Sequence, residues 1–176
     1  MEKTITEALA EIKVIGKRIT SKDDALQNAL VRSSDKIDPH EANGGSTAYV
    51  ASLKQGIKAL TDNIVAIRTA ILKKNCEETI TVAGVTKTIS EWLVWKREVY
   101  PVLSSLYNGM QNRIRRADSD MDSYGRMSQG EDKKSAIINA DIQALNNDAE
   151  QIAACYEQLD GQLSLKNATL MVDIPE

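Results

Sequence analysis

The stretch KTITE at residues 3–7 returns as KTISE at residues 87–91, and a long helical pattern follows each copy. Self-similarity of this kind is the sequence signature of a supersecondary unit that is used more than once. We therefore expect one helix–turn–helix–strand module in residues 1–83 and a second in residues 84–176, with the two packed as one elongated domain.

Each copy of the stretch contains a capping box. In this motif a threonine hydroxyl accepts a hydrogen bond from the backbone amide three residues on, and the glutamate at that position accepts one from the amide of the threonine. Thr4 and Glu7 fit the motif in the first copy, and Thr88 and Glu91 fit it in the second. The sequence thus predicts that two helices begin directly after Thr4 and Thr88.

The most regular apolar spacing in the chain follows a polar, turn-rich stretch that ends at Ser46, the predicted N-cap of the next helix. Apolar side chains alternate in steps of three and four, and the seam comprises Val50, Leu53, Ile57, Leu60, Ile64, Ile67 and Ile71. Three heptads of this spacing indicate coiled-coil packing. The seam can be covered within the chain or by a second copy, and we expect a homo-oligomer.

The second half repeats this plan with larger side chains. One helical face comprises Trp92, Trp95, Val99, Val102, Leu106, Met110 and Ile114. Pro101 lies within the pattern, and because proline lacks an amide hydrogen we expect the helix to kink or begin anew there. A loop is predicted at residues 117–130, and a further helix carries apolar residues from Ile138 to Leu163.

Two short segments have the alternation of β-strands. TITV at residues 79–82 and VTK at residues 85–87 flank Ala83 and Gly84, which predicts a β-hairpin. LMVDI at residues 170–174 predicts a final strand, with the hairpin as its expected partner.

Composition favours a mainly α fold. Of the 176 residues 42% are hydrophobic but only 4% are aromatic, with no phenylalanine, so the core falls to aliphatic side chains that suit helix-on-helix packing. We expect a duplicated long α-hairpin, that is, a four-helix, coiled-coil-like bundle with a small β-hairpin and a short C-terminal strand.

Charge and hydropathy narrow the partners and the compartment. A net charge of −3 argues against nonspecific binding to nucleic acid, which needs basic surface. No apolar run approaches the ~20 residues that cross a bilayer, so no membrane partner is expected. Early charged residues exclude a signal-peptide pattern, so we expect a cytoplasmic protein, or a virion component if it is phage-encoded. In that setting Cys76 and Cys155 are expected to be reduced.

Candidate catalytic and metal-binding residues are few. His40 is the only histidine, which excludes Ser–His–Asp and Cys–His catalysis and makes a zinc site improbable. Aspartates at 118, 120 and 122 alternate as in a calcium loop, but Ser123 and Gln129 stand where an EF-hand needs glycine and glutamate. We expect no enzyme activity, no cofactor and no metal.

The densest basic cluster is RIRR at residues 113–116. Cations near a helix C-terminus offset the helix dipole, which is one sufficient explanation. The alternative is a site for a small anionic ligand, formed by Arg113, Arg115, Arg116, Tyr124 and Arg126. Trp92 and Trp95 have two readings as well, core packing or an interface hot spot that doubles as a stacking platform for a base.

A set of spaced residues resembles the signature of septicolysin-like proteins, a bacterial and phage family. The matching positions are Ile71, Asn75, Thr79, Gly84, Thr88 and Glu91, and the resemblance covers about half of the chain. It implies an elongated helical protein that assembles through coiled coils and has no established enzymatic activity. Trp92, Trp95 and the long tip loops depart from that family's pattern.

Together these observations favour a non-enzymatic, self-assembling helical protein with a structural or scaffolding role, of expected phage origin. The alternative is an oligomeric binding protein that sequesters a small anionic ligand, such as a nucleotide signal, in an anti-defence role.

Overall fold

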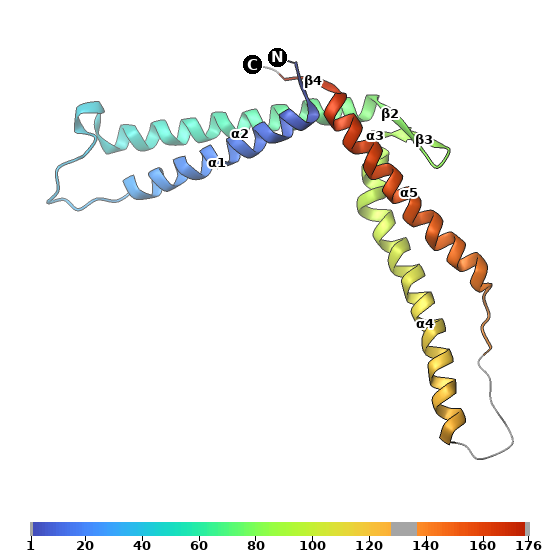
Figure 1. Cartoon of the computed structure of the whole chain (residues 1–176). Coiled ribbons are helices and arrows are strands. Elements are labelled where there is room, and N and C mark those ends of the chain that lie inside the picture. The colour runs from blue at the N-terminus through green and yellow to red at the C-terminus, as the bar shows by residue number, and fades with distance from the viewer. Residues whose placement is uncertain (1, 128–136, 175–176) are drawn as a thin grey trace. The chain divides into compact units, whose positions relative to one another are not determined.

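The structure is a computed structural model that describes residues 2–127 and 137–174, with side chains described for 2–117 and 137–174. It confirms a mainly helical fold, with two short antiparallel strand pairs in the described part of the chain (Figure 1). The chain divides into two compact units. The first runs to Glu77 and takes up the chain again from Ser164, and the second comprises Glu78–Leu163.

The first unit is a long α-hairpin. It contains β1 (Glu2–Thr4), α1 (Ile5–Ala29), the 3-10 turn η1 (Glu41–Asn43), α2 (Gly45–Glu77) and β4 (Met171–Asp173). Figure 1 shows α1 and α2 side by side, joined by a loop at one end of the hairpin.

The core of the first unit lies between α1, α2 and the end of the chain. It consists of Ile5, Ala8, Ile15, Ile67, Ile71, Val172 and Ile174. Every member of the seam from Val50 to Ile71 is buried or half-buried, with Leu53, Ile67 and Ile71 buried. The regular spacing on α2 therefore marks a covered face, and α1 is the helix that covers it.

Both predicted capping boxes are confirmed. The Thr4 hydroxyl accepts from the Glu7 amide at 3.2 Å, and the Glu7 carboxylate accepts from the Thr4 amide at 2.8 Å. Thr88 and Glu91 make the same two bonds at the same distances. Hydrogen bonds to the threonine amide and hydroxyl lower the pKa of both glutamates.

The prediction for the final strand's partner was wrong. β4 pairs antiparallel with β1, with Lys3 opposite Val172, and the Ile5 amide extends the ladder to the Leu170 carbonyl at 3.1 Å. The sequence of β1, Glu-Lys-Thr, has no apolar alternation and so carries no strand signal. Its pairing follows from the core, where Val172 is buried beside Ile5.

The second unit begins with the predicted hairpin, which is confirmed. β2 (Thr79–Val82) pairs with β3 (Val85–Thr88) across a two-residue turn. Ala83 and Gly84 have φ of 49° and 76°, the left-handed pair that a tight hairpin turn of the primed type requires. The Ala83 amide donates to the Gln158 side chain at 3.0 Å, which ties the turn to helix α5.

Four helical segments complete the second unit. They are α3 (Ile89–Val94), the π-helical turn η2 (Trp95–Val99), α4 (Tyr100–Met127) and α5 (Ile142–Thr169), the last of which continues into the first unit. The predicted break near Pro101 is confirmed as this π turn, in which the Tyr100 amide donates to the Trp95 carbonyl. The α-helix then begins anew just before the proline.

Three predicted boundaries were wrong. The apolar pattern predicted that the first helix ends near Ser33, but α1 ends at Ala29, and α5 begins at Ile142 rather than Ile138. The predicted loop at 117–130 is helical as far as Met127. Polar composition suggested a loop there, but a helix that has already nucleated extends through polar residues at little cost.

The predicted N-cap at Ser46 was also wrong. α2 begins at Gly45, and the Ser46 amide donates to the carboxylate of Asp38 at 2.8 Å, so a loop aspartate provides the cap. The two cysteines are free thiols, and burial raises the pKa of Cys155. No helix within the described ranges is long and apolar enough to span a membrane.

Candidate interaction surface

Helix α4 packs on α5 through one mixed face. The half-buried residues of this face are Tyr100, Leu103, Tyr107, Gln111 and Ile114. The Tyr100 ring stacks on Tyr156 of α5 at 4.0 Å between centroids, and the Gln111 amide donates to the Asn146 side chain at 2.9 Å. Aromatic and polar groups thus take part in the contact between the two helices, beside the aliphatic Leu103 and Ile114.

A second face of α4 is aliphatic and open. It is formed by Val99, the last residue of the π turn, together with Val102, Leu106 and Met110 of α4. We call these four residues the α4 stripe, and all four side chains are exposed. Val102 is 65% exposed and Leu106 is 52% exposed. Members of the stripe follow one another at intervals of three or four residues, so their side chains lie on one side of the helix. The apolar arc of α4 is therefore wider than its neighbour α5 covers, which is typical of a helix that serves two partners.

The π turn explains why the face predicted from Trp92 to Ile114 is not continuous. A π turn contains about one residue more than an α turn, and one extra residue rotates all later side chains by ~100° about the helix axis. Trp92 precedes the turn and is 3% exposed, whereas Val102 follows it and faces outward. One apolar pattern in the sequence is thereby divided between a buried and an exposed surface.

Aromatic rings surround the π turn. The rings of Trp92 and Trp95 meet edge to face at 5.7 Å, and Trp95 lies 5.8 Å from the ring of Tyr100. Trp92 donates from Nε1 to the Ile80 carbonyl at 3.1 Å, so it is a core residue of the second unit. Trp95 is half-buried and keeps part of its ring at the surface beside the α4 stripe.

Lys96, in the π turn that leads into α4, contacts two residues of α5. Lys96 forms an ion pair with Asp160 and lies 5.2 Å from the ring centre of Tyr156. The hydrogen bond to Asp160 raises the pKa of Lys96. The positive charge of Lys96 is therefore paired within the chain.

The predicted anion site falls on one continuous helix. Arg113, Arg115 and Arg116 are exposed, and Arg115 donates to the Asn112 side chain at 2.9 Å. The backbone of Arg126 lies 13 residues further along α4, about 20 Å at 1.5 Å per residue, so no loop brings it back to Arg113. The side chains of Tyr124 and Arg126 lie outside the described residues, and the anion site stays a prediction.

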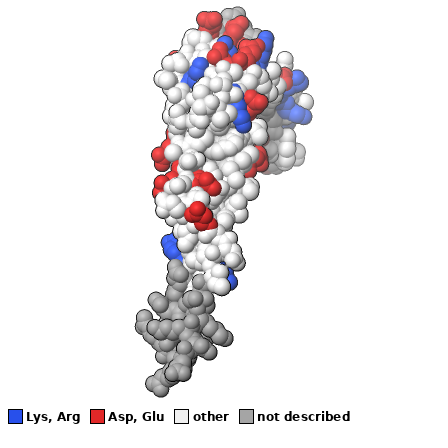
Figure 2. Space-filling model, turned by 90° about the vertical axis from the view of Figure 1, so that its right-hand side faces the viewer, with Lys and Arg blue, Asp and Glu red and all other residues white. Residues whose placement is uncertain are grey.

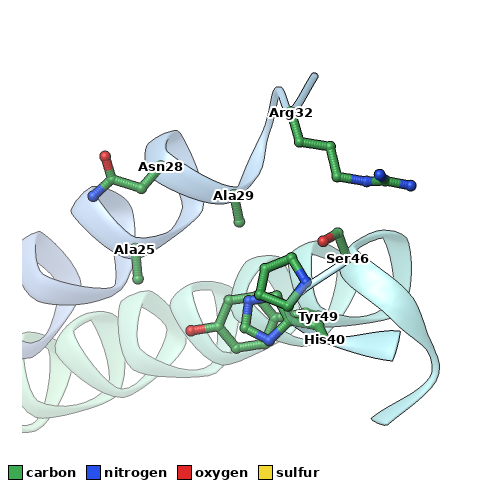
Figure 3. A pocket seen from close by; sticks show the side chains of 8 residues that line it. Ala25, Asn28, Ala29, Arg32, His40, Ser46 and Tyr49 are labelled. Atoms are coloured by element: carbon green, nitrogen blue, oxygen red, sulfur yellow. The ribbon is translucent and has the colours of Figure 1, made fainter. Parts of the chain in front are cut away.

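The loop of the first unit forms a separate small pocket (Figure 3). Its volume is about 280 Å³ and its lining is Ala25, Asn28, Ala29, Arg32, Pro39, His40, Ser46 and Tyr49. The rings of His40 and Tyr49 stack at 3.8 Å, so this histidine is half-buried rather than fully solvated. In Figure 3 the side chain of Arg32 extends away from the stacked rings.

Asp38 organises this loop. Its carboxylate accepts from the hydroxyl and amide of Ser46 at 2.6 and 2.8 Å and from the His40 amide at 2.9 Å. These bonds, those from Ser46 first, lower the pKa of Asp38 to about 2. The Ser46 amide at the start of α2 is therefore occupied by the Asp38 carboxylate and is not free to bind an external anion.

Metal ligands do not converge in the part of the chain that the structure describes, where no group of three or more histidine, cysteine or acidic residues could hold an ion. The aspartates at 118, 120 and 122 lie outside the described side chains, but their backbone is helical rather than a calcium loop. Figure 2 shows acidic and basic side chains mixed near the upper end of the face that it draws, and acidic side chains alone across its middle.

Comparison with known proteins gives one structural likeness. No family model and no curated protein matches the chain. The chain is similar to a solved structure described as a functionally unknown conserved protein from Corynebacterium diphtheriae, with 18% sequence identity and a TM-score of 0.50. The likeness covers 98% of this chain and 100% of that one. At this identity it shows the fold alone.

Two features of the surface carried little or no sequence signal. The exposure of the α4 stripe depends on the π turn, whose only local sign is Pro101. The cap from Asp38 joins residues eight positions apart through a loop, so no capping motif contains it. The aliphatic spacing itself was visible in the sequence, as part of one helical face expected to run from Trp92 to Ile114.

Proposed function

We propose that the protein is a non-enzymatic, self-assembling helical protein with a structural or scaffolding role, whose copies associate through the α4 stripe. The observation that carries the proposal is the exposure of four aliphatic side chains on one side of a long helix. Fully burying such a side chain is worth about 1.5–3 kcal/mol. Covering the exposed parts of four is then worth on the order of 3–6 kcal/mol per copy, which favours association.

The proposal includes the duplication of α-hairpin modules in a coiled-coil-like bundle. Its support is that β1 leads into α1 and β3 leads into α3 through the same capping box. Phage origin and membership of the septicolysin-like family belong to the same proposal, since both rest on the residues around the hairpin and the helix starts.

Sedimentation velocity across a concentration series tests the proposal. We expect a defined oligomer that dissociates on dilution, and Val102→Asp should shift it to monomer by placing a charge in the stripe. Val65→Asp is the matched control, because Val65 of α2 is 64% exposed and also aliphatic but lies outside the stripe. A wild-type monomer at tens of micromolar, or equal effects of the two substitutions, would overturn the proposal.

An alternative function is the sequestration of a small anionic ligand by an oligomer. It is favoured by Arg113 and Arg116, which are exposed and make no ion pair with a described side chain. A ligand that binds only the folded state raises its stability by RT ln(1 + [L]/Kd). A thermal-shift screen with nucleotides should then raise the melting temperature of the wild type and leave Arg113→Glu unchanged, and a flat screen would exclude the alternative.

A further inference from the structure

We propose that Asn43 is a site of spontaneous self-modification, at which the side-chain amide is converted to a carboxylate through a cyclic imide formed with Gly44. The rate is set by the opening of the turn that Asp38 organises. Two observations carry the proposal: the chain contains two Asn-Gly dipeptides in contrasting structures, and the fold requires glycine at only one of them.

The reaction needs only the chain and water. The backbone nitrogen of Gly44 attacks the side-chain carbon Cγ of Asn43, and its proton passes to water. As the new N–Cγ bond forms, the Cγ–Nδ2 bond breaks and Nδ2 leaves as ammonia. One water molecule then opens the cyclic imide at either carbonyl, which gives aspartate or its isomer, isoaspartate. In sum, the amide and one water become a carboxylate and an ammonium ion.

Gly44 favours this attack, because it has no side chain to hinder ring closure. The fold also requires glycine at this position. The φ of Gly44 is 90°, in the left-handed region, and a Cβ there would come within 3.3 Å of the Ala48 side chain. The turn that leads into α2 therefore keeps a reactive dipeptide in place.

The dipeptide lies where the backbone opens easily. Asn43 and Gly44 are both exposed, and no hydrogen bond of the Asn43 side chain is found among the described residues. The Gly44 amide donates to the Glu41 carbonyl at 3.3 Å, a long bond at the end of the 3-10 turn η1. A single 3-10 turn has poorer hydrogen-bond geometry than an α-helix, so little free energy is needed to release this amide for attack.

Asn108 and Gly109 form the second Asn-Gly dipeptide, in a different setting. Both residues are exposed, but they lie inside α4, where the Gly109 amide belongs to the helical hydrogen-bond ladder. The Asn108 side chain donates to the Ser104 hydroxyl at 3.3 Å. A Cβ at Gly109 would meet no atom within 4 Å, so the described chain does not require glycine there. Attack at this site needs the interior of a long helix to open.

Asp38 controls how often the first turn opens. Its carboxylate accepts from the His40 amide at 2.9 Å, and the His40 carbonyl accepts from the amides of Asn43 and Gly45, both at 2.9 Å. The turn is thereby tied to the loop through one carboxylate. Loss of that carboxylate should loosen the turn and expose the Gly44 amide more often.

The product of the reaction changes the same turn. In isoaspartate the backbone passes through the side-chain methylene, which lengthens the chain between the His40 carbonyl and the Gly45 amide. The new carboxylate also lies in the same loop as Asp38, and two negative charges repel each other. We therefore expect the modified protein to lose the cap that Asp38 provides, so that the Ser46 amide exchanges its hydrogen at least about tenfold faster.

Peptide mapping by mass spectrometry tests the proposal in the full-length protein. The wild type is incubated in mildly alkaline buffer, at a concentration too low for the copies to associate, and the conversion of each asparagine is followed. In the folded protein Asn43 should convert at least about tenfold faster than Asn108, because loops open at a much lower free energy than helix interiors. In urea the two should convert at similar rates, which controls for sequence context. Equal rates in the folded protein, or no conversion at Asn43, would overturn the proposal.

A variant of the loop aspartate gives a second readout. Asp38→Asn should raise the rate at Asn43 severalfold and leave the rate at Asn108 unchanged. The asparagine that it introduces precedes Pro39, which has no amide hydrogen, so it adds no further site of this kind. Asp62→Asn, at an exposed position of α2, is the matched control and should leave both rates as in the wild type. No acceleration at Asn43, or equal acceleration at both asparagines, would contradict control by Asp38.

Discussion

A helix in each unit carries the same apolar spacing, but the apolar face is buried in the first unit and exposed in the second. In the first unit the seam of α2 is covered by α1, and Ile67 is 2% exposed. In the second unit the stripe of α4 has the same three–four spacing, yet Leu106 is 52% exposed. The comparison teaches that periodicity identifies an apolar face of a helix but does not identify the partner that covers it.

The largest effect that would sharpen this comparison is on folding stability. Ile67→Ala should lower the free energy of unfolding by about 2–5 kcal/mol, since it removes buried methyl groups and leaves a cavity. Leu106→Ala should change the stability of the monomer by no more than about 0.5 kcal/mol, because its side chain already faces solvent. Urea unfolding, at a protein concentration too low for the copies to associate, measures both changes. Similar losses for the two variants would mean that the stripe is covered within the chain.

The next largest difference in stability is expected between variants of Trp92, which precedes the π turn, and of Trp95, which lies within it. Trp92→Phe removes the hydrogen bond to the Ile80 carbonyl and should cost about 1–3 kcal/mol, because a buried acceptor loses its donor. Trp95→Phe should cost less, since Trp95 is half-buried and no hydrogen bond of its indole is described. Thermal unfolding followed by circular dichroism distinguishes them. A larger loss at Trp95 would contradict the assignment of Trp92 to the core.

The capping boxes offer a test in which the two units should behave alike. Thr4→Ala and Thr88→Ala each remove a cap, which typically costs about 1 kcal/mol. Equal losses in urea unfolding would show that the repeated motif does the same work in both units. A negligible loss at one site would show that tertiary contacts there already hold the helix start in place.

The smallest expected effect concerns the loop of the first unit. The pKa of Asp38 is lowered from its ordinary 3.8 to about 2, so the unfolded chain binds the proton more readily than the folded one. The stabilisation is therefore complete above pH 3.8 and is lost as the pH falls towards 2. An NMR titration of the Asp38 carboxyl should give a midpoint near 2, whereas a midpoint near 3.8 would contradict the hydrogen bonds from Ser46. Asp38→Asn should remove this part of the acid sensitivity.

Short-range rules account for what the sequence predicted correctly. The two capping boxes, the hairpin turn at Ala83 and Gly84, and the break near Pro101 each depend on residues within a few positions of one another. The seam of α2 was recognisable because seven apolar residues follow one period without interruption. Boundaries at residues 29, 127 and 142 were missed because polar composition alone does not decide where a helix ends.

The candidate surface was only half predictable. The aliphatic residues of the α4 stripe were identified as one helical face, but that face was expected to be continuous with Trp92, and the sequence left open whether the chain itself or a second copy covers it. The extra residue in the π turn separated the two, and no apolar pattern records such a turn. The pairing of β1 with β4 was invisible for a related reason, because the three residues of β1 have no strand periodicity.

By itself the amino-acid sequence determined where the principal helices start, which of their faces are apolar and where the chain turns back in a hairpin, because these depend on local hydrogen bonds and on the helical period. Only the tertiary structure decided which apolar face is covered and which strands pair. Those outcomes depend on contacts between segments far apart in the chain, such as Ile5 with Val172, and on the rotation that one π turn adds to everything after it.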